Sequence, residues 1–81
     1  MVANTIREKL FAVLSSLLAV PREQLGNDSS RQNLAQWDSL KHMHLMLALE
    51  EEFNIEFDDD EMADLANAGA LLEVISRKVG T

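Results

Sequence analysis

The chain has 81 residues, no cysteine, and 14 acidic against seven basic residues, which gives a formal net charge of −7 at neutral pH. This composition excludes a disulfide framework and a thiolate metal site. It also argues against nucleic-acid binding, which depends on clustered Lys and Arg. The length predicts one domain, residues 1–81, with a thin core that depends on helix packing.

The first predicted helix begins at Thr5, which acts as an N-cap with Glu8 three residues later as its capping-box partner. Pro21 cannot continue a helix, so this helix ends by Val20. Apolar residues at helical spacing predict its buried face: Ile6, Leu10, Val13, Leu14 and Leu17.

The same segment has some features of a signal peptide, because Arg7 and Lys9 precede an apolar stretch. Glu8 interrupts the charged start, however, and the small-residue cleavage pattern is missing before Pro21. No apolar run is long enough to span a bilayer. We therefore expect a cytoplasmic protein with no stable membrane insertion.

A long connection from Pro21 to Trp37 follows, with turn-forming residues at 26–30. Leu25 and Leu34 are its predicted core anchors, and Trp37 is a possible third. Connections of this length are uncommon in compact domains and are often functional. This one leads directly to Ser39.

The second helix is predicted from Ser39 to Glu52, with Asp38 as its N-cap. Its apolar surface is too broad to be buried fully against three short neighbours, so we expect part of it to stay exposed. That surface comprises Leu40, Met43, Leu45, Met46, Leu47, Leu49 and Phe53.

Two more helices follow. Asp58 and Glu61 mark the start of a short third helix, while Asn67 caps a fourth that ends at Gly80. The predicted inward residues are Met62, Leu65, Leu71, Leu72, Ile75 and Val79. The fold class is thus all-α, a four-helix bundle with a long loop between helices one and two.

Catalysis and metal binding are both disfavoured. A serine nucleophile needs a base within reach, but His42 and His44 follow Ser39 on the same helix and do not easily reach back to it. The two histidines point about 200° apart on a helix, so they cannot share a metal ion. The acidic run 58–61 lacks the alternating ligands and glycine of a calcium loop. We predict no catalytic residue and no metal site.

The position of Ser39 suits an attached phosphate, because the first turn of a helix has unpaired N–H groups and a positive dipole end. Lys41 opposes that dipole in the bare helix but would sit well against a phosphate. Glu50, Glu51 and Glu52 are equally unfavourable at the other end. Residues 50–64 carry nine acids and no base, which indicates a docking surface.

Asp38-Ser39-Leu40, followed by the stretch 46–57, resembles an acyl carrier protein, and residues 20–26 resemble that family's link after helix one. The resemblance implies a non-enzymatic carrier with 4′-phosphopantetheine on Ser39, its thiol holding an acyl or aminoacyl group as a thioester. Asp38 and Leu40 would flank the modified serine, and Lys41 would lie near the phosphate.

By position, the resemblance also implies partner contacts at Leu47, Glu50, Glu51, Glu56 and Asp59. The alternative interpretation of Leu47 is simple core packing. The implied partners are a phosphopantetheinyl transferase, a ligase that loads the acyl or aminoacyl group, and a downstream synthase or transferase. We expect a monomer.

Three departures from the family's fatty-acid members favour a specialised lipid, polyketide, peptide or aminoacyl pathway. Gln36-Trp37 replaces Gly-Ala, Lys41 replaces an acid, and His44 stands where Glu is frequent. His44 is therefore a further candidate for partner binding, although an ordinary exposed histidine is the simpler interpretation. The alternative function is an unmodified helical adaptor that binds basic proteins through its acidic second helix.

Overall fold

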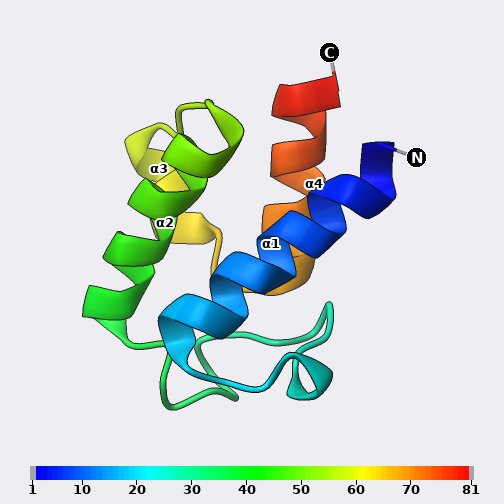
Figure 1. The fold of residues 1–81 in the computed structure, drawn as a ribbon. Helices are drawn as coiled ribbons and strands as arrows, with labels where there is room; N and C mark the ends of the chain where they lie inside the picture. The colour runs from blue at the N-terminus through cyan, green and yellow to red at the C-terminus, as the bar shows by residue number, and fades with distance from the viewer. Residues whose placement is uncertain (1, 81) are drawn as a thin grey trace.

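A computed structural model describes residues 2–80 and contains, within them, four α-helices, one 3-10 helix and no strand. The elements are α1 (Val2–Leu18), η1 (Arg22–Gln24), α2 (Ser39–Phe53), α3 (Asp59–Asp64) and α4 (Ala68–Gly80). α1 packs against both α2 and α4, and the long connection passes beneath the C-terminal end of α1 (Figure 1). The predicted all-α four-helix fold with a short third helix is confirmed.

The core lies where α1, α2 and α4 meet, and Trp37 from the long connection is buried in it. Its largest fully buried side chains are Leu10, Leu14, Leu18, Trp37, Leu45, Met46, Leu49, Leu71 and Ile75. Each such burial contributes about 1.5–3 kcal/mol relative to an exposed side chain. Leu25 and Leu34 pack against this core, as predicted. Phe11 and Leu18 belong to it as well, although the periodicity analysis left them out.

The start of α1 differs from the prediction. Thr5 lies within α1, which begins at Val2, so Thr5 is not the N-cap. No glycine or proline occurs among residues 2–5, so nothing in the local sequence stops the helix from extending past the predicted capping box.

Val79 is the second correction, because it is 39% exposed and does not face inward. A helical period of 3.6 residues carries the buried stripe from Leu71 through Ile75 to Lys78. Lys78 is half-buried, and its Nζ lies 3.0 Å from Glu61 Oε1 on α3. In the last turn of α4, Lys78 and not Val79 therefore faces α3.

Backbone hydrogen bonds tie the long connection to the start of α4. Ala68 N donates to Ser29 O at 2.8 Å, and Gly69 N donates to Asn27 O at 2.8 Å. A Cβ at Gly69 would stand only 3.0 Å from Asn27 O, so this close approach favours glycine. The connection that delivers Ser39 is thus anchored along its length.

The predicted caps of the last three helices are confirmed. Asp38 Oδ1 accepts from Lys41 N at 2.8 Å, and Asn67 Oδ1 accepts from Ala70 N at 2.7 Å. Asp58 and Glu61 form a reciprocal capping box at the start of α3. Each cap contributes about 1 kcal/mol to its helix.

No helix within residues 2–80 has the length and apolarity to cross a membrane.

Candidate functional site

Ser39 is the first residue of α2, and it is exposed. The first hydrogen bond of the helix runs from His42 N to Asp38 O at 2.8 Å, and the Asp38 side chain takes the N–H of Lys41. The N–H groups of Ser39 and Leu40 therefore precede the intrahelical hydrogen bonds, as the first N–H groups of any helix do. An anion attached to the Ser39 oxygen would meet these donors and the positive end of the dipole.

Arg31 is the cation that contacts Ser39. Its Nη2 donates to Ser39 Oγ at 2.9 Å, across eight residues of the chain. No carboxylate within residues 2–80 forms an ion pair with Arg31. Arg31 was not predicted from the sequence, because only the folded path of the connection brings it to Ser39. The length of that connection was the one signal pointing to this region.

Lys41, which was expected near the phosphate, extends in this structure toward α1. Its Nζ lies 3.4 Å from Leu17 O, in the last turn of α1. A cation there interacts favourably with the negative end of the helix dipole. A part for Lys41 in holding a phosphate remains a prediction.

A hollow of about 350 Å³ opens beside Ser39 between α2 and α3. Met43, Met62 and Ala63 give it apolar walls, and Arg31 and Ser39 stand at its polar side. His42 and Asp59 complete the lining. A group attached to Ser39 would find this hollow next to its point of attachment.

His42 is buried, and its hydrogen bonds link α2 to the long connection and to α3. Trp37 Nε1 donates to His42 Nδ1 at 3.0 Å, and His42 Nε2 lies 2.6 Å from Met62 O on α3. Since Nδ1 accepts, the hydrogen-bond network assigns the proton to Nε2, which donates to the carbonyl. Both ring nitrogens are thus engaged away from Ser39. No structural role was predicted for His42 from the sequence. His44 is exposed, as predicted.

Most of the predicted partner residues lie at the surface. Leu47 is 52% exposed, so its side chain is not packed in the core. It forms an exposed apolar stripe along α2 with Leu40 and Met43. The exposed polar members are His44, Glu51, Glu56 and Asp59.

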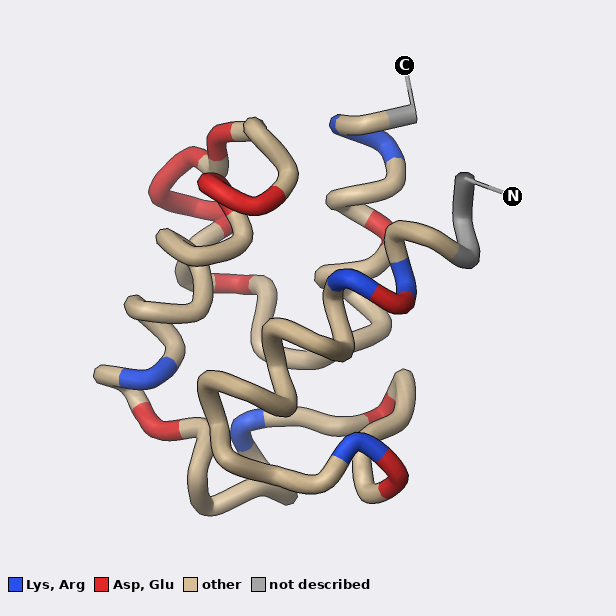
Figure 2. The backbone as a smooth tube through the Cα atoms, in the orientation of Figure 1, with Lys and Arg blue, Asp and Glu red and all other residues tan. Residues whose placement is uncertain are grey.

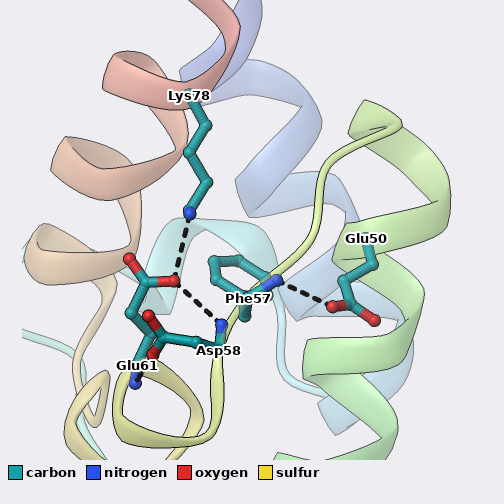
Figure 3. A network of polar contacts seen from close by, with 5 residues as sticks. All are labelled: Glu50, Phe57, Asp58, Glu61 and Lys78. Atoms are coloured by element: carbon teal, nitrogen blue, oxygen red, sulfur yellow. Dashed lines mark hydrogen bonds and ion pairs between the residues drawn. The ribbon is translucent and has the colours of Figure 1, made fainter.

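Glu50 differs from those residues because its carboxylate contributes to the fold. It is half-buried, and its Oε2 accepts from Phe57 N at 2.8 Å (Figure 3). This hydrogen bond holds the chain where it leaves α2 toward α3.

Acidic residues gather around the end of α2 and α3, whereas both signs of charge occur near the start of α2 (Figure 2). In residues 2–80, no group of three or more His, Asp or Glu side chains is arranged to hold a metal ion.

The chain is similar to known proteins over most of its length. Residues 8–75 match a family described as "Phosphopantetheine attachment site". The chain is 36% identical to a protein of Guillardia theta over 74 residues, or 91% of each chain. It is 35% identical to a protein of Prochlorococcus marinus (strain MIT 9515) over 75 residues, covering 93% of this chain and 94% of the relative. It is 34% identical to a protein of Thermosynechococcus vestitus over 76 residues, covering 94% of each. All three are named acyl carrier protein.

Proposed function

The chain belongs to the family of phosphopantetheine-binding acyl carrier proteins, and from this premise we propose that Ser39 Oγ is the atom that carries its prosthetic group. The single observation that supports this assignment most directly is the exposed hydroxyl at the start of α2, beside two N–H groups that lie outside the helical hydrogen bonds. Asp38 and Leu40 flank it. The residues present therefore fit a phosphoester.

The protein is a carrier and not an enzyme. The bound 4′-phosphopantetheine supplies a terminal thiol that holds an acyl group as a thioester. This chain's own residues give the point of attachment, the hollow beside it and the surfaces that partner enzymes read. Consistent with that role, both ring nitrogens of the buried His42 are engaged by Trp37 and Met62 and not by Ser39.

Two kinds of partner follow from the family: a phosphopantetheinyl transferase and enzymes that process acyl groups. We place the transferase at Asp38 and Leu40. For the ligase that loads the acyl or aminoacyl group and for the downstream synthase or transferase, the exposed Leu47 stripe and the exposed acids Glu51, Glu56 and Asp59 support docking there. His44, exposed on the same helix, joins this surface. The carrier acts as a cytoplasmic monomer.

A specialised pathway is supported by the residues around the attachment point. Lys41 stands two residues after Ser39, where fatty-acid members of the family usually have an acid, and its ammonium group contacts Leu17 O on α1. Trp37 is hydrogen-bonded to the buried His42, so the Trp37 position has a structural role of its own. The charge around Ser39 is therefore more mixed than in a carrier with acids throughout α2. We propose service to a dedicated lipid, polyketide, peptide or aminoacyl route.

Intact-mass measurement tests the attachment site. The purified apo-protein is incubated with coenzyme A and a broad-specificity phosphopantetheinyl transferase, and we expect one phosphopantetheine adduct. Ser39→Ala removes the acceptor oxygen and abolishes the adduct. Ser16→Ala, at another exposed serine, is the matched control and should be modified like the wild type. Absence of any adduct, or an adduct that survives Ser39→Ala, would contradict the proposal.

A further inference from the structure

We infer that Arg31 is a phosphate-binding residue for the prosthetic group, holding the phosphodiester on Ser39 by charge-assisted hydrogen bonds. This inference rests on the proposed attachment at Ser39. Its starting point is the contact from Arg31 Nη2 to Ser39 Oγ, 2.9 Å long. Transfer of phosphopantetheine from coenzyme A replaces the hydroxyl proton with phosphorus, releases adenosine 3′,5′-bisphosphate and keeps this oxygen, so that the charged phosphate oxygens lie two bonds beyond it.

The backbone of Arg31 is fixed in place before any group is attached. Its N–H donates to Ala66 O at 3.1 Å, next to the bridge between Ser30 and Asn67. The turn that follows Arg31 is held by Leu34 N and Asn33 N, which both donate to Ser30 O. A guanidinium that starts from a fixed backbone loses less freedom on binding than one from a mobile loop.

The chemistry of Arg31 suits a phosphodiester. A guanidinium presents several N–H donors in a planar fork and pairs with phosphate oxygens in a bidentate manner. Arg31 is half-buried and forms no ion pair within residues 2–80, so no carboxylate competes for it. In this structure the hydroxyl of Ser39 is the side-chain group that its guanidinium contacts.

The charges around Ser39 favour such a cation. Asp38 immediately precedes Ser39, and a phosphodiester would place a second negative charge beside that carboxylate. Lys41 directs its ammonium group at Leu17 O on α1. Arg31 is therefore the cation already positioned to offset the added charge, and it also lines the hollow that opens from Ser39.

Phosphorus NMR of the holo-protein tests this inference without reference to any pathway. The wild type, Arg31→Gln, Arg31→Lys and Arg22→Gln are each loaded, and intact mass confirms the adduct before the spectra are recorded. Arg22 lies in η1 and is exposed, so Arg22→Gln matches the charge change away from Ser39. We expect the phosphodiester resonance to shift in Arg31→Gln, to shift less in Arg31→Lys, and to stay at the wild-type position in Arg22→Gln.

A second measurement needs no substitution at Arg31. In the isotope-labelled wild-type holo-protein, a direct hydrogen bond produces scalar coupling between a guanidinium nitrogen and phosphorus, and Arg22→Gln retains it. A loaded protein with no coupling, and with the same resonance in Arg31→Gln as in wild type, would overturn the inference while leaving attachment at Ser39 intact. A wild type that takes no adduct at Ser39 would instead overturn the proposed function, and the inference with it.

Discussion

The two ends of α2 use polar side chains in different ways. At its start, contacts from other elements fix the geometry around one exposed oxygen: Arg31 reaches Ser39, and His42 ties α2 to Trp37 and to α3. At its end, the polar contacts serve the turn into α3, where Glu50 holds Phe57 N. The start of the helix is built as a fixed site, and the end as a charged surface.

The acidic run 50–64 divides accordingly. Three of its nine acids hydrogen-bond to the backbone of this turn: Glu50, Asp58 and Glu61 (Figure 3). Glu61 also pairs with Lys78 at 3.0 Å. The other members of the run are exposed: Glu51, Glu52, Glu56, Asp59, Asp60 and Asp64. A run of like charges therefore contains both structural acids and acids that are available to a partner.

The largest expected effect comes from the buried histidine under the fixed site. His42→Ala leaves Trp37 Nε1 and Met62 O without their partner and opens a cavity, so we expect a loss of about 2–4 kcal/mol in the free energy of unfolding. His44→Ala, two residues away and exposed, should change it by less than about 0.5 kcal/mol. Chemical denaturation followed by helical circular dichroism measures both values. If His42→Ala lowered the free energy of unfolding by as little as His44→Ala, the His42 network would not stabilise the fold.

At the acidic end, Glu50 and Glu51 form a matched pair with different surroundings. Glu50→Ala deprives Phe57 N–H of its acceptor, and we expect it to cost about 1–2 kcal/mol of unfolding free energy. Glu51→Ala removes an exposed charge and should stay within about 0.5 kcal/mol of wild type. Glu50→Gln keeps an oxygen acceptor and should recover most of the loss. A Glu50→Gln variant as unstable as Glu50→Ala would mean that the charge matters, and not the hydrogen bond.

The cap of α2 gives a smaller effect. Asp38→Ala should lower the unfolding free energy by about 1 kcal/mol, because Lys41 N loses its acceptor. Asp38→Asn retains a capping oxygen and should stay close to wild type. Thermal unfolding of the three proteins measures the difference. A destabilised Asp38→Asn variant would indicate that the carboxylate charge contributes beyond the cap.

The helices and most of their caps could be predicted from the sequence, whereas contacts between distant segments could not. Local rules identified the helices and the caps at Asp38, Asp58 and Asn67, because each of these depends on residues a few positions apart. They also placed Ser39 at an exposed helix start. Contacts between distant segments were missed: Arg31 with Ser39, and Lys41 with Leu17. No spacing pattern encodes such contacts, since the three-dimensional path of the connection decides them.

The smallest effect on stability is expected for the exposed acids, and there the readout is binding. Glu51→Lys should leave the unfolding free energy within about 0.5 kcal/mol of wild type. Its association with a loading enzyme should slow by about three- to tenfold at low salt, and the difference should shrink as salt screens the charges. Glu23→Lys, exposed in η1, makes the same change of charge away from the acidic surface and serves as the control. If both variants slow association equally, net charge alone steers the partner, and the acids at the end of α2 have no special place in docking.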